Sequence, residues 1–308
     1  MRLSDMGERE IIKLITARLR KRSGSSIDFE EDAAVFSSER KRFVISTDMG
    51  FFSTHFTSLN PKKIAKKIVT STFTDLLAKN SIPKHMLLSI GVPKNYDSKF
   101  LSELYSALDR ELSKYGAFLI GGDTNSSSEF CYCATVIGEL NGKFLPRNGA
   151  KAGDFIVLTG EIGNAAAGYF MKHKHLKGSA HLLKAQEEPS IDVSLCKKIS
   201  KGANAGIDIS DGLAFELGEM ARLSKKKITM DWGEIPLSDD FLRFCKFHHI
   251  DEEELALNKG EDYQIAFSTP SEKHGIVVGK VSKGNGVFLR RNGKTKRIST
   301  KGYEHFIS

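Results

Sequence analysis

Aspartate residues recur at places where an apolar run of this chain ends in small residues. Carboxylates that converge on one cleft repel one another unless cations lie between them. All-oxygen ligands favour Mg²⁺ over zinc or copper, and Mg²⁺ is usually shared with substrate phosphates. The pattern predicts a magnesium-dependent enzyme that acts on phosphates, although any single aspartate could instead cap a helix or close a turn. The recurring aspartates are Asp48 in FVISTD, Asp75 in TSTFTD, Asp123 in FLIGGD, Asp211 in GIDISD and Asp32 in EEDAAV.

Residues that could bind phosphate stand near these acids. Gly122 has no side chain, so an anion could come close to the backbone N–H groups just before Asp123. Ser210 is the expected N-cap of a helix in DGLAFELGEMARL, and the amides of a helix N-terminus favour anions. Arg147, in the turn-rich PRNGA, could form a fork on a phosphate or a surface ion pair. The chain has no Walker A sequence and no protein-kinase catalytic loop.

Two further polar residues are weak signals when taken singly. His55 follows Asp48 by seven residues, and a lone histidine is more often structural than functional. Glu261 lies in NKGEDYQIAF, just before an expected strand, where acidic residues usually form loops.

Length and composition describe an ordinary globular protein. The 308 residues suggest about two domains, and 40% hydrophobic with 27% charged residues is typical of a soluble chain. No apolar run approaches the ~18 residues that span a bilayer, and the N-terminus lacks the apolar region of a signal peptide, so a cytoplasmic protein with no membrane partner is expected. The four cysteines show no metal-finger spacing and are expected to be free thiols.

The net charge of +8 raises the question of a nucleic-acid partner. The lysines are scattered in short runs without interleaved aromatic residues or a recognisable binding module. A basic chain also attracts small polyanions such as ATP. We therefore expect no nucleic-acid partner, and a salt titration of nucleic-acid binding would test this.

Apolar periodicity predicts a mixed α/β chain whose elements could bring these residues together. Helices are predicted over 8–19, from Asn60-Pro61 onward, and over 97–116. In the second of these, Asp75 continues the stripe of Ile64 and Ile68, so its carboxylate should point inward.

Strands are predicted at FVIST, AFLIGG, EFCYCATVIGEL, FIVLTG, GIDIS and several later segments. Residues 172–190, with scattered His and Lys, read as a solvated connection. The turn-rich stretch LPRNGAKAGD suggests a domain boundary near residue 150, which gives domains 1–150 and 151–308.

In order and spacing, these segments form a specific combination. The chain resembles the thiamine-monophosphate kinase family, part of the superfamily that includes aminoimidazole ribonucleotide synthetase and selenophosphate synthetase. The matching segments run through nearly the whole chain and are MGEREII, EDAAV, STDMGFFSTHF, TSTFTDLLAKNSIP, LIGGDT, PRNGAKAGD, LTGEIGNAAAG, IDISDGL, KGEDYQIAF and GYEHF.

The resemblance implies ATP-dependent phosphorylation of thiamine monophosphate to thiamine diphosphate with several Mg²⁺ ions. It also implies two domains, each a mixed or antiparallel sheet packed with helices, with the N-terminal domains of two chains pairing in a homodimer. The N-terminal domain would bind ATP and magnesium, and the C-terminal domain would complete the cleft.

Site residues follow from the same resemblance. The positions that match metal ligands are Asp32, Ser46, Thr47, Asp48, Asp75, Asp123, Asp208 and Asp211. Those that match nucleotide contacts are Gly122, Asp123, Arg147 and Ser210. Those that match substrate contacts are His55, Glu261 and Tyr303.

No general acid or base is implied, because the attacking atom would be an oxygen of the substrate's own phosphate, which is already anionic near neutral pH. The metals would screen the repulsion between two polyanions and align an in-line transfer.

The chain departs from the family pattern at three places. Glu30-Glu31-Asp32 stands where the family has G-D-D, Thr72-Phe73-Thr74-Asp75 where it has N-L-S-D, and Lys259 where a glycine is common. The acids at Asp32 and Asp75 are kept. Competing interpretations are another ATP-using member of the superfamily and a nucleotide-binding regulator that has lost turnover.

Overall fold

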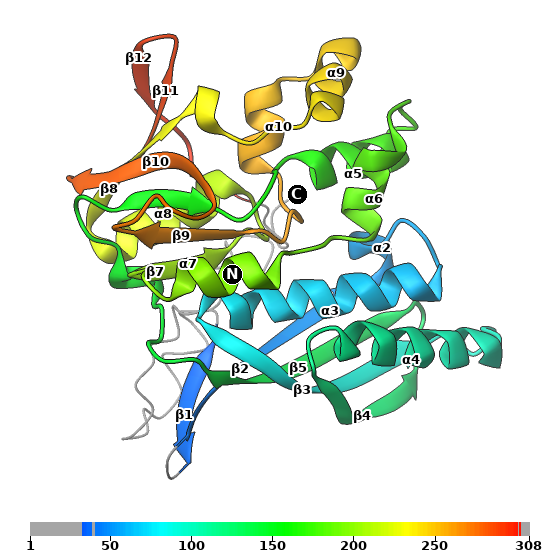
Figure 1. Ribbon diagram of the computed structural model, residues 1–308. Coiled ribbons are helices and arrows are strands. Elements are labelled where there is room, and N and C mark those ends of the chain that lie inside the picture. Colours follow the sequence, from blue (N-terminus) through cyan, green and yellow to red (C-terminus); the bar gives the residue numbers. More distant parts are fainter. Residues whose placement is uncertain (1–32, 39–40, 301, 303–308) are drawn as a thin grey trace, which may run out of the picture.

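A computed structural model describes residues 33–38, 41–300 and 302 of the chain. Two β-sheets lie one above the other, with helices between and around them (Figure 1). This confirms the predicted mixed α/β class. The helix predicted over 8–19 and the site residues Asp32 and Tyr303 lie outside the described residues.

The first sheet has five strands in the order β1-β2-β5-β3-β4. Neighbours are antiparallel except β3 and β4, which are parallel. The strands are β1 (Ala34–Ser38), β2 (Lys41–Phe51), β3 (Ser81–Val92), β4 (Phe118–Ser126) and β5 (Cys131–Leu140).

Two long helices, α3 (Pro61–Ala78) and α4 (Ser98–Ser113), cover one face of this sheet (Figure 1). The start of α3 is the predicted one: the side chain of Asn60 accepts a hydrogen bond from the backbone N–H of Lys62 at 3.0 Å, and proline follows. Ile64 and Ile68 are fully buried in the core beneath. The short helix α2 (Phe52–His55) follows β2 directly.

The second sheet has seven strands in the order β12-β11-β8-β10-β6-β9-β7. Only β11 and β8 are parallel among its described pairs. The strands are β6 (Phe155–Leu158), β7 (Ala205–Asp208), β8 (Lys226–Asp231), β9 (Ile265–Thr269), β10 (Ile276–Lys283), β11 (Gly286–Arg291) and β12 (Lys294–Arg297).

Helices surround the second sheet, and α8 packs into its main core. The helices are α5 (Asn164–His173), α6 (Ala180–Glu187), α7 (Val193–Ser200), α8 (Leu213–Ser224), α9 (Asp239–His248) and α10 (Glu252–Asn258), with the 3₁₀ turns η2 (Arg147–Gly149) and η3 (Trp232–Glu234). The solvated connection predicted over 172–190 was wrong, because α6 lies there with Leu182 fully buried.

Helix α3 lies between the two sheets and contacts strands of both. Its C-terminal end and β7 approach closely: a Cβ added to Gly206 would lie 2.2 Å from the carbonyl oxygen of Ala78. This contact sets acids on α3 beside acids at the end of β7. None of the helices in the described ranges has the length and apolar composition needed to cross a membrane.

Candidate active site

Three predicted carboxylates meet at the junction of the two sheets. Asp48 comes from β2, Asp75 from α3, and Asp208 from the carboxyl end of β7. All three line one pocket of about 390 Å³. The remaining lining residues are Met49, Thr54, His55, Ser71, Ala166, Tyr169, Phe170, Ser210, Asp211, Lys259, Gly260, Glu261 and Tyr263.

The alternation of β2 explains why Asp48 and Ser46 reach this pocket side. They are two residues apart, so both side chains face α3. The hydroxyl of Ser46 donates a hydrogen bond to Asp75 Oδ2 at 2.6 Å, and Asp48 Oδ1 accepts one from the backbone N–H of Met49 at 2.8 Å. The Ser46–Asp75 hydrogen bond therefore joins β2 to α3 at the site.

Burial makes these acids hold protons more tightly than usual. Desolvation raises the pKa of Asp48 to about 6, against the opposing hydrogen bond from Met49. The pKa of Asp75 is raised well above its usual range, first by burial and then by the charge of Asp208. Burial also raises the pKa of Asp208, although Arg147 and Lys79 oppose the shift. A site with this balance favours bound cations.

Oxygen donors of this kind fit Mg²⁺ when phosphate is present. In the ranges that the structure describes, no three His, Cys, Asp or Glu side chains are grouped so that they could hold one ion. Mg²⁺ commonly takes one or two carboxylates and completes its shell with water and substrate phosphate oxygens. The pairs of carboxylates in the pocket suit that arrangement, whereas an all-protein metal cage is absent among these residues.

A buried lysine behind the acids was missed by sequence reasoning. Lys79 is fully buried at the end of α3, and its Nζ donates to the carbonyl oxygen of Gly206 at 3.0 Å. Its charge acts on both Asp75 and Asp208. The available signal was its spacing of four residues from Asp75, which places both on one face of the helix.

The turn at Ser210 and Asp211 also borders the pocket. The predicted N-cap was wrong: α8 begins at Leu213, and Gly212 occupies the capping position without a side-chain hydrogen bond. The hydroxyl of Ser210 instead donates to Glu216 Oε1 at 3.2 Å, and the backbone N–H of Asp211 donates to the same oxygen at 3.3 Å. Burial raises the pKa of Glu216 to about 8.

The segment around Glu261 is folded tightly against this turn. The backbone N–H of Glu261 donates to the carbonyl oxygen of Ser210 at 2.8 Å, and that of Tyr263 donates to Ile209 at 3.0 Å. Glu261 and Tyr263 have φ values of 69° and 47°, which non-glycine residues rarely adopt. Backbone strain of this kind is common where side chains are aimed into a functional site.

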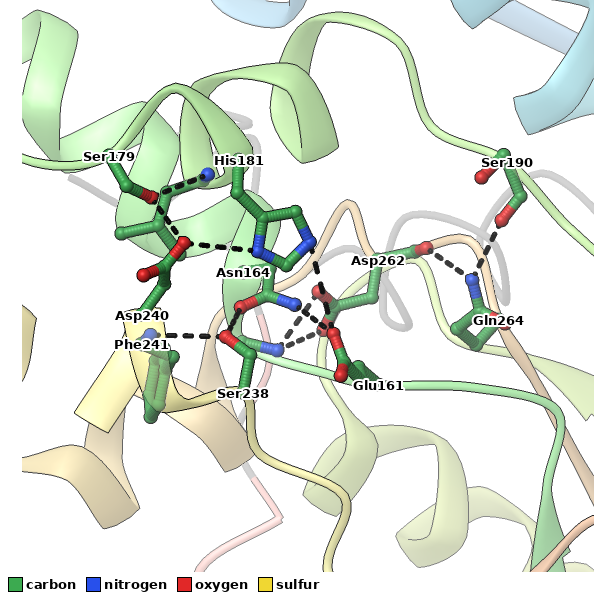
Figure 2. A network of polar contacts seen from close by, with 12 residues as sticks. Glu161, Asn164, Ser179, His181, Ser190, Ser238, Asp240, Phe241, Asp262 and Gln264 are labelled. Carbon is green, nitrogen blue, oxygen red and sulfur yellow. Dashed lines mark hydrogen bonds and ion pairs between the residues drawn. The ribbon is translucent and has the colours of Figure 1, made fainter. Parts of the chain in front are cut away.

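Asp262, between these two residues, does not line the pocket and belongs to a polar network (Figure 2). Both of its carboxylate oxygens accept hydrogen bonds from the backbone N–H of Gly163, at 2.9 and 3.0 Å, just before α5. Burial raises its pKa to about 7. Ser238 donates to Asn164 at 2.6 Å and so links the start of α5 to α9. The network fixes α5, whose Tyr169 and Phe170 form an aromatic wall of the pocket that the sequence did not indicate.

Three other predicted residues lie away from the carboxylates. Thr47 faces the opposite side of β2 from Asp48, where its hydroxyl lies 3.2 Å from that of Thr135. Gly122 and Asp123 lie on β4, with β5 and β3 between β4 and β2, which is three strand spacings or about 14 Å. Asp123 is exposed, and its Oδ1 accepts a hydrogen bond from the backbone N–H of Thr124 at 2.8 Å.

His55 and Arg147 flank the site at different depths. His55 lines the pocket, and its Nδ1 accepts a hydrogen bond from the backbone N–H of Phe51 at 3.1 Å. Arg147, in η2, is half-buried and acts electrostatically on Asp208 and Glu216.

Comparison with known proteins decides the family. The models for the N-terminal and C-terminal domains of AIR synthase related proteins match residues 30–140 and 151–291. The thiamine-monophosphate kinase of Buchnera aphidicola is 32% identical over 90% of this chain and 91% of its own length. The chain belongs to the thiamine-monophosphate kinase family.

Other members of the thiamine-monophosphate kinase family match over almost their full length. The enzyme of Pyrococcus horikoshii is 29% identical over 98% of this chain and 97% of its own. A structure of AaThiL complexed with AMPPCP and TMP superposes with a TM-score of 0.89 at 28% identity, covering 99% of both chains.

The structure explains how this member tolerates Lys259 where the thiamine-monophosphate kinase family commonly has glycine. Lys259 has φ −118° and ψ 142°, an extended conformation open to any residue. Its side chain is exposed and lines the pocket.

Proposed function

We propose that this protein phosphorylates thiamine monophosphate to thiamine diphosphate, with ATP and Mg²⁺, by direct in-line transfer. The observation that carries the proposal is the convergence of Asp48, Asp75 and Asp208, from both sheets and the helix between them, on one pocket. Family membership supports the choice of substrates, since a solved structure of the relative AaThiL is complexed with AMPPCP and TMP.

The chemistry of the acceptor suits a pocket of this kind. A phosphate monoester oxygen is a nucleophile near neutral pH, so no side chain is assigned as general acid or base. The obstacle is repulsion between two polyanions. Bound Mg²⁺ ions would neutralise the phosphates. Each ion would be held by one or two of the pocket aspartates Asp48, Asp75, Asp208 and Asp211, and Ser46 orients Asp75.

The resemblance suggests a division between nucleotide and acceptor residues. Ser210 lines the pocket and Arg147 acts electrostatically on Asp208 from outside the lining, and both would face the nucleotide phosphates. The lining residues His55 and Glu261 would face the acceptor. Tyr169 and Phe170 line the pocket and would give an aromatic ring apolar contacts. Among the described lining residues, Lys259 is the one lysine or arginine, so its charge would attract a phosphate at the entrance.

Part of the site residue proposal comes from resemblance alone. Asp32 and Tyr303 keep their proposed metal and substrate roles without structural support, because they lie outside the described residues. Gly122 and Asp123 keep their proposed nucleotide roles, and Asp123 and Thr47 their metal roles. Gly122 and Asp123 could fill these roles at the pocket only after a rearrangement of the chain. Thr47 would need either such a rearrangement or metal binding through its backbone carbonyl oxygen. A division of the chain at residue 150 and a cytoplasmic location belong to the same proposal.

A homodimer is part of the proposal, and the open face of the first sheet supports it. Helices α3 and α4 cover one face of this sheet (Figure 1). Strand alternation and exposure place five apolar side chains of β2, β3 and β4 on the other face. They are Met49, which also borders the pocket, Phe51, Leu87, Phe118 and Ile120. A contiguous apolar patch on a sheet typically marks a protein interface. In a dimer joined through this face, Asp123 would lie at the interface.

A coupled ADP-release assay tests the function. We expect turnover with thiamine monophosphate that requires Mg²⁺ and forms one diphosphate per ADP. Thiamine lacks the phosphate that the metal ions would bridge to ATP, so it should give little ADP. Comparable phosphorylation of thiamine, or turnover with aminoimidazole precursors in place of thiamine monophosphate, would refute the proposal.

A further inference from the structure

Lys67 is a buried cation that neither the family pattern nor the carboxylate cluster accounts for. It lies within α3, one helical turn before Ser71 and two before Asp75. The residue is 2% exposed, although it belongs to the lysine-rich run KKIAKK, which resembles a solvated surface. Burial lowers the pKa of its ammonium group, and the charges of Glu261 and Glu187 oppose that shift.

Two polar contacts hold this ammonium group, and both are with residues proposed above to face the acceptor. Its Nζ is 3.0 Å from Glu261 Oε1. The same atom donates a hydrogen bond to the carbonyl oxygen of His55 at 2.6 Å. A buried lysine is costly without such partners, so these contacts determine where it lies.

The contacts join three segments that are distant in sequence. His55 ends α2, Lys67 lies in α3, and Glu261 belongs to the strained segment that packs on Ser210. The second oxygen of Glu261 accepts a weaker hydrogen bond from Gln186 at 3.5 Å. The carboxylate is therefore held from two sides, and Lys67 links it to the backbone of His55.

We propose that Lys67 is a positioning residue for the acceptor substrate, which acts by holding His55 and Glu261 on the same wall of the pocket. This inference rests on the proposed function. Lys67 does not line the pocket and sits away from the three aspartates. Its removal should therefore disturb the acceptor side and leave the nucleotide side intact.

The test compares Lys67→Met with Lys66→Met, the same change at the neighbouring lysine. Lys66 is more exposed and lies 4.0 Å from Glu188, outside the pocket. In Lys67→Met we expect kcat/KM for thiamine monophosphate to fall about 10- to 100-fold, the range for a displaced positioning group, and KM for ATP to stay within about twofold. Lys66→Met should resemble the wild type in both constants.

A double variant distinguishes the proposed role of Lys67 from a folding defect. Lys67→Met leaves a carboxylate without its buried partner, whereas Lys67→Met with Glu261→Gln removes both charges. If Lys67 acts through Glu261, its substitution should cost much less in the Glu261→Gln background than in the wild type. Lys67→Arg keeps the charge and should restore part of the acceptor affinity.

Three outcomes would overturn the inference. They are a parallel loss for ATP and acceptor, full additivity with Glu261→Gln, or a lowered melting temperature with unchanged KM for the acceptor. Wild-type protein that releases no ADP with thiamine monophosphate would refute the proposed function itself, and the acceptor role of Lys67 with it.

Discussion

At the scale of single residues, the acids of the pocket work against the stability of the metal-free protein. Asp48 and Asp75 are both held with raised pKa values, mainly by burial. We predict that Asp48→Asn or Asp75→Asn lowers phosphoryl transfer by at least about 10²-fold. Thermal stability without Mg²⁺ should stay level or rise, because a desolvated charge is removed. Enzyme assays and thermal melts measure both, and near wild-type turnover in either variant would refute the metal-site assignment.

The same residues show what the sequence could reveal. An aspartate that continues the apolar stripe of α3 had to point inward, and Asp75 does so. A lysine carries no such mark, so Lys67, in the basic run KKIAKK, and Lys79, in LLAKNS, were missed. Both lysines are buried because α3 packs between the two sheets, whose strands come from separate parts of the chain. Both nevertheless lie on the Asp75 face of the helix, at multiples of four residues.

At the scale of elements, the segment from Lys259 to Tyr263 depends on one glycine. A Cβ added to Gly260 would lie 1.7 Å from the carbonyl oxygen of Ser210, so any side chain must push the two segments apart. We predict that Gly260→Ala lowers kcat/KM for the acceptor at least about tenfold. Gly233→Ala is the matched control, because nothing lies within 4 Å of its added Cβ. Equal activity of the two variants would contradict the role given to this contact.

Element predictions from the sequence succeeded where the signal was local and failed where a tertiary contact decided. Asn60 and Pro61 specify the start of α3 by themselves. Ser210 looked like a cap but donates instead to the buried Glu216, and the helix begins three residues later. Helix α6 is short and has a weak apolar stripe, so its formation relies on packing against α5 and α9 rather than on periodicity.

At the scale of the whole molecule, the open face of the first sheet should determine the oligomeric state. Phe118 is 64% exposed and Ile120 is 53% exposed, both on the edge strand β4. We predict that light scattering at micromolar concentration gives about twice the chain mass of 34.1 kDa. Phe118→Asp with Ile120→Asp should return the mass to that of one chain. Phe247→Asp, at a 72% exposed position on α9, should leave the dimer intact. A monomeric wild type would refute the dimer.

The charge balance of the molecule also couples metal binding to pH. Asp48 has a pKa of about 6 in the folded protein against an ordinary value of 3.8, so the folded state binds this proton more tightly than the unfolded chain. Its effect on stability is therefore neutral below about pH 4. It becomes increasingly unfavourable as the pH rises to about 6, by at most about 3 kcal/mol. Asp75 and Asp208 shift in the same direction.

Cations reverse this cost, because a carboxylate must lose its proton before it binds a metal. We predict that Mg²⁺ with an ATP analogue raises the melting temperature more at pH 8 than at pH 5.5. The difference should shrink in Asp48→Asn and in Asp75→Asn, where fewer carboxylates compete with protons. Melts at both pH values, with and without chelator, measure the effect. An equal Mg²⁺-dependent shift at the two pH values would mean that these buried acids are not where the metal binds.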